Sequence, residues 1–174
     1  MSNPDIINEE INLERLKGLV NKKLKEMGSS SVYNKISQLL PETEAREALR
    51  DKKILYVDDL LNLLEIFLPA LIVASDGHAD ILQYTGQSIE ELTKQILNIN
   101  PDILLLDYHL SETLKGHSVS HYLREQNFNG NIIGFSSDTN TSYQFEEAGA
   151  NGSIDKDTSH RKETVEQIAK LIKK

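Results

Sequence analysis

From residue 53 onward, short apolar runs alternate with longer stretches in which apolar residues recur at helical spacing. Short apolar runs bounded by polar or turn-forming positions are typical of strands buried on both faces of a parallel sheet. Strands are predicted at 53–57, 70–74, 102–107, 131–135 and 151–155. Helices are predicted between and after them, at 60–67, 88–98, 118–126, 142–148 and 159–172.

This alternation predicts an α/β domain with a doubly wound, five-stranded parallel sheet and right-handed crossovers. The start of the second helix is marked by Ser88 and Glu91, which have the spacing of a capping box. Pro101 marks the return from that helix into the third strand. The predicted second strand is followed by a long polar loop over 75–87.

The first fifty residues have a different pattern, which predicts an N-terminal helical extension. One apolar stripe at steps of three and four residues predicts a helix. Its members are Leu13, Leu16, Val20, Leu24 and Met27. A stripe this narrow cannot form a core alone, so it packs on the α/β domain, on its own copy in a homodimer, or on a partner. These three alternatives stay open.

Gly28 and the serines after it end this first helix. A second, shorter helix is predicted at 32–40, before Pro41, followed by a polar helical connector over 42–50. We therefore divide the chain into an N-terminal helical extension, 1–50, and an α/β domain, 51–174.

Composition excludes several classes of site. The chain has 174 residues, of which 39% are hydrophobic and 26% charged, as in ordinary globular proteins. It has no cysteine, which rules out disulfides and thiolate metal sites. No apolar run approaches the length of a membrane span, and no signal-peptide pattern begins the chain. We therefore expect a cytoplasmic protein.

The net charge of −8 is distributed unevenly. Residues 1–50 carry 8 basic and 8 acidic side chains, whereas residues 51–174 carry 11 and 19, so the acidic surplus lies entirely in the α/β domain. An acidic domain disfavours direct nucleic-acid binding, because phosphate backbones require a basic face. The charge suits a partner with a basic surface, or a bound cation.

Carboxylates follow two of the predicted strands. Asp58 and Asp59 close the first strand, and Asp107 closes the third. The carboxyl ends of parallel strands meet at one edge of the sheet, where open α/β sheets bind ligands. Clustered carboxylates repel one another unless a cation offsets their charge. The sequence therefore indicates a site for a hard divalent ion with oxygen ligands, for which we expect Mg²⁺.

Two later strand ends add a hydroxyl and an ammonium to the same edge. Ser136 closes the fourth strand, and Lys156 follows the fifth. A carboxylate nucleophile, a metal ion, a hydroxyl donor and a cation are the groups that phosphoryl transfer requires, because its catalysis consists mainly of positioning and charge neutralisation.

The ordered set of motifs resembles the receiver domain of two-component response regulators, over residues 51–174. Each motif alone is weak, but their order and their positions at strand ends are specific. The resemblance implies the flavodoxin-like receiver fold. The motifs are Val57-Asp58-Asp59, Leu106-Asp107, Phe135-Ser136-Ser137, and Ala148-Gly149-Ala150 followed by Lys156.

The resemblance also implies a role for each site residue. Asp107 would accept a phosphoryl group from a histidine kinase or phosphotransfer protein. Asp59 would bind Mg²⁺ directly and Asp58 through water, and the backbone carbonyl of His109 would be a further ligand. After phosphorylation, phosphoryl oxygens would be bound by Ser136 and Lys156. The last predicted helix ends the chain, so we expect signalling through protein–protein contacts and no C-terminal output domain.

Three positions depart from the pattern of the family. Ser111 stands where the family commonly has proline, Asp157 follows Lys156 where the family has a cis-proline, and Ser153 replaces an aromatic residue. A cis bond without proline would cost about 3 kcal/mol, so a trans bond is expected at Asp157. These departures favour an alternative, a pseudo-receiver that acts as a phosphorylation-independent interaction module. The presence of Asp107 and Lys156 opposes it.

Two further readings are disfavoured. A Mg²⁺-dependent phosphatase would need a carboxylate two residues after Asp107, where His109 stands. We therefore expect no enzyme activity beyond self-catalysed phosphoryl transfer. His117 and His121 are spaced to share one helix face and bind a metal. The sequence offers no evident third ligand, so a solvated helix face is preferred.

Overall fold

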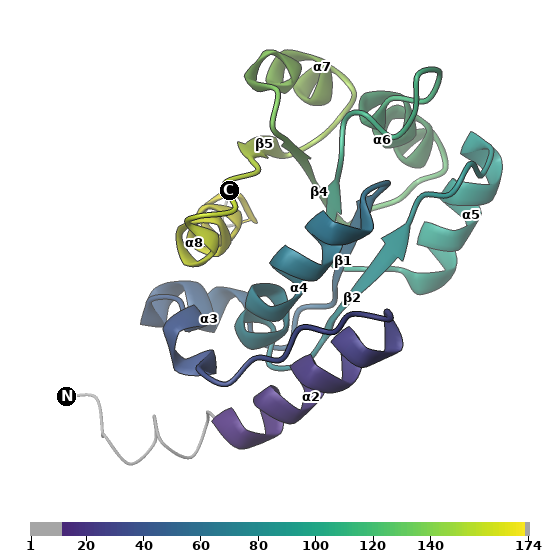
Figure 1. Cartoon of the computed structure of the whole chain (residues 1–174). Helices are drawn as coiled ribbons and strands as arrows, with labels where there is room; N and C mark the ends of the chain where they lie inside the picture. Colours follow the sequence, from purple (N-terminus) through teal and green to yellow (C-terminus); the bar gives the residue numbers. More distant parts are fainter. Residues whose placement is uncertain (1–11, 173–174) are drawn as a thin grey trace.

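The computed structural model describes residues 12–172, so residues 1–11 of the predicted extension lie outside the described part. Its centre is a sheet with helices packed around it (Figure 1). The sheet has five parallel strands in the order β2-β1-β3-β4-β5. This order confirms the predicted doubly wound sheet. The strands are β1 (Ile54–Asp58), β2 (Ala79–Gln83), β3 (Ile103–Leu106), β4 (Asn131–Ser136) and β5 (Gly152–Asp155).

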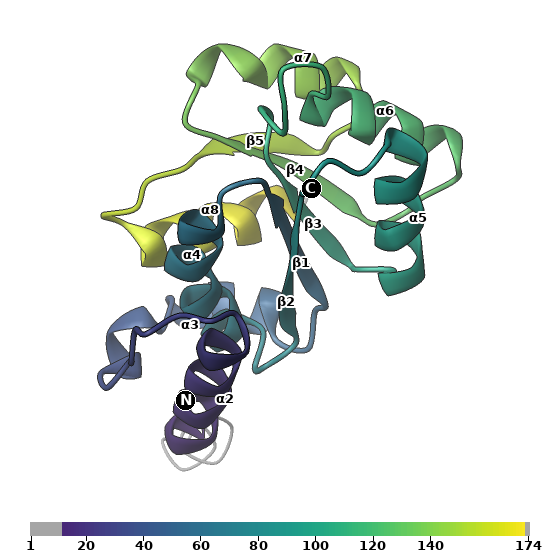
Figure 2. The same ribbon diagram turned by 45° about the vertical axis from the view of Figure 1, so that its right-hand side comes forward.

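Helices cover both faces of the sheet (Figure 2). On one face α4 (Leu61–Ala74) and α8 (Arg161–Ile172) share a core cluster with Ile54 and Tyr56 of β1. On the other face α5 (Ile89–Ile99), α6 (Gly116–Glu125) and α7 (Ser142–Glu147) pack on Leu55 and Val57. Successive β1 residues thus point to opposite faces, as expected of a strand buried on both sides. A short 3-10 turn, η2 (Thr139–Thr141), precedes α7.

The prediction of a strand at 70–74 was wrong. These residues form the second half of α4, and β2 lies further on, inside the predicted loop 75–87. The apolar run misled because the second half of α4 is buried on all sides, with every residue from Phe67 to Ala74 buried. Pro69 lies inside α4, and the helix continues through it. A helix without a polar face loses the periodicity that identifies it.

The leucine stripe packs inside the chain. The helix α2 (Leu13–Glu26) lies against α4, and its Leu16, Val20 and Leu24 are buried in the same core as the sheet. This confirms the intramolecular alternative for the stripe. A homodimer through it would first require α2 to leave α4. The division of the chain at residue 50 stays a prediction.

The rest of the extension is less helical than predicted. The helix expected at 32–40 is reduced to the 3-10 turn η1 (Ile36–Leu39), and the connector forms α3 (Thr43–Leu49).

Salt bridges join α2 to the α4–β2 segment, from Arg15 to Asp76 at 2.5 Å and from Lys23 to Asp80 at 3.3 Å.

Other local predictions hold. The capping box of Ser88 and Glu91 is present at the start of α5. No peptide bond within residues 12–172 is cis, so the bond before Asp157 is trans, as expected. Among the described helices, none has both the length and the apolar character needed to cross a membrane.

Candidate functional site

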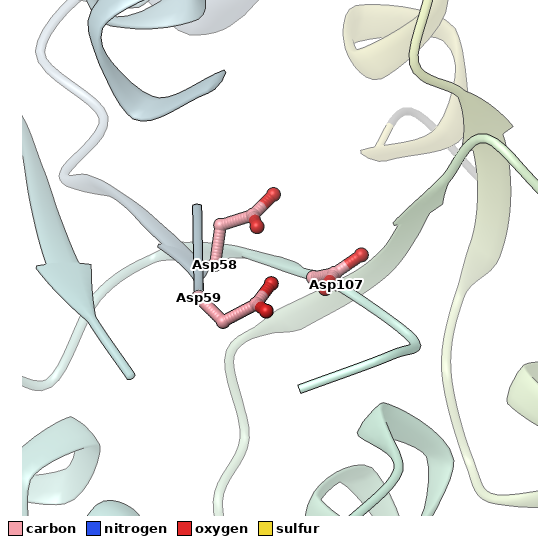
Figure 3. A group of neighbouring side chains, drawn as sticks. All are labelled: Asp58, Asp59 and Asp107. Carbon is pink, nitrogen blue, oxygen red and sulfur yellow. The ribbon is translucent and has the colours of Figure 1, made fainter. Parts of the chain in front are cut away.

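Three carboxylates meet at the carboxyl edge of the sheet (Figure 3). Asp58 is the last residue of β1, Asp59 follows it, and Asp107 follows β3. Each offers an oxygen, and these oxygens lie within 4.8 Å of one another. Asp58 is completely buried and Asp107 is 4% exposed, while Asp59 is only partly buried. The parallel topology thus brings together the three carboxylates predicted from the sequence.

Lys156 joins two of these carboxylates. Its Nζ lies 2.6 Å from Asp58 Oδ2 and 2.6 Å from Asp107 Oδ1, and its side chain is 5% exposed. The backbone N–H of Lys156 donates to the carbonyl of Ser136, which fixes the loop after β5 against the end of β4. The ammonium, which comes from the loop after β5, thus bridges the carboxyl ends of β1 and β3.

One ammonium does not balance the cluster. Three ionised carboxylates and one ammonium sum to a formal charge of −2. Burial raises the pKa of Asp107, and the nearby charge of Asp58 adds to this, whereas Lys156 opposes it. Burial, a hydrogen bond with Asp58 and repulsion from Asp107 raise the pKa of Asp59 to about 6. The uncompensated charge is what a divalent cation would offset.

The donor set fits Mg²⁺. The three residues offer only oxygen atoms, which hard cations prefer, and neither imidazole nor thiolate joins them within the described residues. Asp59 is the most accessible of the three, and among residues 12–172 it has no cationic partner of the kind that Lys156 gives the others. Asp59 and Asp107 could therefore hold an ion while Lys156 stays in place.

Tyr56 is a site residue that sequence reasoning missed. Its hydroxyl donates to Asp58 Oδ2 at 2.5 Å, and the backbone N–H of Leu60 donates to Asp58 Oδ1 at 3.0 Å. Burial and the charge of Asp58 raise the pKa of Tyr56, so the hydroxyl keeps its proton. The available signal was spacing: residues two apart on a strand share a face, which directs Tyr56 toward Asp58.

Ser136 lies at the same edge, with its side chain buried. In the register of β3 and β4, Leu106 pairs with Gly134, so Ser136 is two positions beyond that pair. Its Oγ accepts from the backbone N–H of Asp138 at 3.1 Å. The hydroxyl is therefore held by the loop that follows β4.

His109 links two loops beside the cluster. Its Nε2 lies 3.5 Å from Asp138 Oδ2, and its Nδ1 lies 3.4 Å from Lys115 Nζ. Lys115 also donates to the carbonyl of Ser111 at 2.8 Å, within the loop between β3 and α6. The side chain of His109 thus connects the β3–α6 loop to the β4–η2 loop.

Gly116 is a second residue whose role the sequence did not reveal. A Cβ at this position would lie 2.1 Å from the backbone oxygen of Asp107. The N–H of Gly116 donates to the carbonyl of Tyr108 at 2.7 Å. The start of α6 therefore rests directly on the main chain of Asp107, and only glycine allows that approach.

The histidines of α6 do not form a metal group. His117 stacks on Tyr108 with ring centroids 5.1 Å apart, and burial lowers its pKa. His121 lies 3.2 Å from Glu125, one turn further along the same helix. Within residues 12–172, only the aspartate cluster unites three groups close enough to share an ion. His121 is exposed, as expected of a solvated helix face, whereas His117 is partly buried against Tyr108, so the predicted solvated face holds for His121 alone.

The fold is that of receiver domains. No protein-family model and no curated protein matches the sequence. Among solved structures, a putative response regulator NarL receiver domain from Mycobacterium tuberculosis aligns at 22% identity and TM-score 0.54, covering 70% of this chain and 98% of that one. A LuxR-family DNA-binding response regulator from Staphylococcus aureus aligns at 20% identity and TM-score 0.55, over 69% and 98%.

A third similar structure contains ligands. The receiver domain of the histidine kinase CKI1 from Arabidopsis thaliana, complexed with Mg²⁺ and BeF3⁻, aligns at 17% identity and TM-score 0.53, over 72% of this chain and 95% of that one. At these identities the likeness establishes the receiver fold that the sequence predicted.

Proposed function

We propose that this protein is the phosphoacceptor receiver of a two-component phosphorelay. Asp107 would take a phosphoryl group from a histidine kinase or phosphotransfer protein, and the signal would pass on through protein–protein contacts. The observation that carries the proposal is the Lys156 ammonium, which bridges Asp58 and Asp107 within a carboxylate cluster that keeps surplus negative charge. The receiver fold supports it.

The chemistry follows from the contacts of Asp107. Its Oδ1 is engaged by Lys156, which leaves Oδ2 to attack phosphorus. A P–O bond forms to Asp107, and the P–N bond of the donor phosphohistidine breaks. The bond electrons stay with the departing imidazole, which takes a proton from solvent. Lys156 and, after rotating, the hydroxyl of Ser136 would then bind phosphoryl oxygens.

Mg²⁺ is the cofactor that this site would hold. We propose Asp59, Asp107 and the backbone carbonyl of His109 as direct ligands, with Asp58 acting through water. The ion would neutralise charge on the transferring oxygens. The surplus charge of the cluster and the pKa of Asp59 support an ion at this place.

The pseudo-receiver remains the second candidate, because specific contacts favour it. Lys156 already contacts both buried carboxylates, and the Oγ of Ser136 already accepts from the backbone N–H of Asp138. If these side chains bind only one another, the cluster would stabilise the fold and bind no phosphoryl group. In that case the protein would act as an interaction module without phosphate.

The deciding experiment is intact-protein mass spectrometry after incubation with acetyl phosphate and Mg²⁺. For a working receiver we expect a gain of about 80 Da, one phosphoryl group, in the wild type but not in Asp107→Asn. The gain should vanish with EDTA. No gain, together with no Mg²⁺ binding by calorimetry, would favour the pseudo-receiver. Repeated turnover of a phosphomonoester would indicate a phosphatase instead, the remote alternative.

A further inference from the structure

Tyr56 is a buried titratable residue that the proposed chemistry does not yet use. It is completely inaccessible in the middle of β1. Its ring packs edge-on against Phe67 and Phe135, with centroids 6.1 and 5.2 Å away. This packing fixes the ring, so the direction of its hydroxyl toward Asp58 is set by the core.

Two donors converge on the same oxygen of Asp58. The hydroxyl of Tyr56 and the ammonium of Lys156 lie 2.5 and 2.6 Å from Oδ2. The other oxygen accepts from the backbone of Leu60. Asp58 is therefore not dependent on Lys156 alone, which matters because a buried carboxylate without donors is strongly destabilising.

In the proposed reaction, Lys156 also has to bind the phosphoryl group on Asp107. When Asp107 carries a phosphoryl group, the ammonium has to turn from the bare carboxylates toward the phosphoryl oxygens. Asp58 then loses the donor shared with Asp107. The hydroxyl of Tyr56 cannot follow, because its ring is held by the aromatic packing around it.

We infer that Tyr56 is a positioning residue for phosphoryl transfer: its hydroxyl keeps Asp58 hydrogen-bonded while Lys156 moves to the phosphoryl group on Asp107. The inference rests on the proposed function. Without this hydroxyl, the Lys156 ammonium would be the one side-chain donor to Asp58, so its move to the phosphoryl group would leave Asp58 without any. A buried tyrosine with only a structural role would affect stability and leave the reaction rate unchanged.

The test is Tyr56→Phe, which keeps the ring and removes the hydroxyl. We expect phosphorylation by acetyl phosphate, at saturating Mg²⁺, to slow about tenfold, the effect of one hydrogen bond to a charged group. The Mg²⁺ dissociation constant should change less than about twofold, because the hydroxyl contacts Asp58 and the proposed direct ligands are other residues. Tyr122→Phe, on α6, is the matched control and should phosphorylate like the wild type.

A double-mutant cycle shows whether Tyr56 acts through Lys156. In a Lys156→Met background, the further change Tyr56→Phe should slow phosphorylation less than about twofold. The same tenfold loss in both backgrounds would overturn the inference, since Tyr56 would then act independently of the ammonium. A wild-type rate in Tyr56→Phe alone would overturn it as well, and so would a loss explained by weaker Mg²⁺ binding.

A measurement on the wild type covers the case in which Tyr56→Phe does not fold. The buried hydroxyl proton of Tyr56 should give a resolved proton NMR signal, which persists when Mg²⁺ and beryllofluoride, a phosphoryl mimic, are added. Loss of the signal on binding would overturn the inference. If the wild type takes up neither phosphate nor beryllofluoride, the proposed function fails and the inference fails with it. If the wild type is phosphorylated and the variant matches it, only the inference fails.

Discussion

The ammonium of Lys156 lies 2.6 Å from Oδ1 of Asp107, although the two residues are 49 positions apart in the sequence. Both side chains are almost completely buried. A buried ion pair is stable only when each charge keeps its partner, so the loss of one member leaves an uncompensated charge in the core. The same two residues therefore contribute to the stability of the fold and to the proposed phosphoryl transfer.

Replacing Lys156 should lower the stability of the folded protein. In Lys156→Met we expect the free energy of unfolding near neutral pH to fall by about 3 kcal/mol, because two buried carboxylates lose their shared cation. Urea denaturation measures this change. Lys170→Met, an exposed position on α8, should stay within about 0.5 kcal/mol of the wild type. Equal stability of the two variants would show that the carboxylates are protonated or solvated instead.

The pKa of Asp59 predicts how stability depends on pH. Its folded value of about 6 lies above its ordinary value of 3.8, so the folded state binds this proton more tightly than the unfolded state. The group therefore destabilises the metal-free protein above pH 6, and this destabilisation is relieved as the pH falls from about 6 toward 4. The raised pKa of Asp107 acts in the same direction.

Thermal unfolding with EDTA and with Mg²⁺ tests this. We expect Mg²⁺ to raise the melting temperature near neutral pH, and to do so much less below pH 6, where a proton competes for Asp59. Asp59→Asn should melt higher than the metal-free wild type near neutral pH and should respond little to Mg²⁺. A variant that responds to Mg²⁺ like the wild type would place the ion elsewhere.

The sequence predicted four of the five strands. Three of them, β1, β3 and β4, are short apolar runs followed by a polar site residue, whereas β5 has Ile154 as its one large apolar residue and is followed by Lys156. The second strand was missed since β2 lies at the edge of the sheet, where only Ala79 is fully buried and the polar residues Asp80 and Gln83 leave no apolar run. The run at 70–74 looked like a strand because α2 covers the outer side of α4. Only the tertiary arrangement distinguishes a helix buried on all sides from a buried strand.

From the sequence one could predict which side chains gather at the carboxyl edge of the sheet, but not how they contact one another. Parallel topology brings Asp58, Asp59 and Asp107 together once the strands are assigned. The sequence could not show that Lys156 would bridge Asp58 as well as Asp107, because that depends on the path of the loop after β5. Tyr56 was hidden because a tyrosine inside an apolar strand looks like any other core residue.

Two glycines should respond in opposite ways to the same substitution. In Gly116→Ala the new methyl would meet the Asp107 carbonyl at 2.1 Å, so the backbone has to shift. We expect a loss of about 2 kcal/mol in unfolding free energy and slower phosphorylation of Asp107. Gly18→Ala, inside α2 with no atom within 4 Å of the added methyl, should gain about 0.5–1 kcal/mol. A neutral Gly116→Ala would mean that α6 does not rest on the Asp107 main chain.

The packing of α2 makes the N-terminal helix part of the stability of the whole chain. Leu24 is fully buried in the core cluster that includes α4 and the sheet, so Leu24→Ala should lower the unfolding free energy by about 3 kcal/mol. Because the core is shared, circular dichroism and tyrosine fluorescence should report one coincident transition. Lys25→Ala, exposed on the same helix, should have little effect.

The dependence of stability on protein concentration distinguishes packing of α2 within one chain from packing of α2 on a second copy. Since the stripe is buried within one chain, the urea midpoint of the wild type should not change over about a hundredfold range of concentration. Leu24→Ala should be destabilised by the same amount at both ends of that range. A midpoint that rises with concentration, and a defect in Leu24→Ala that shrinks as concentration falls, would mean that α2 exchanges α4 for a second copy in solution.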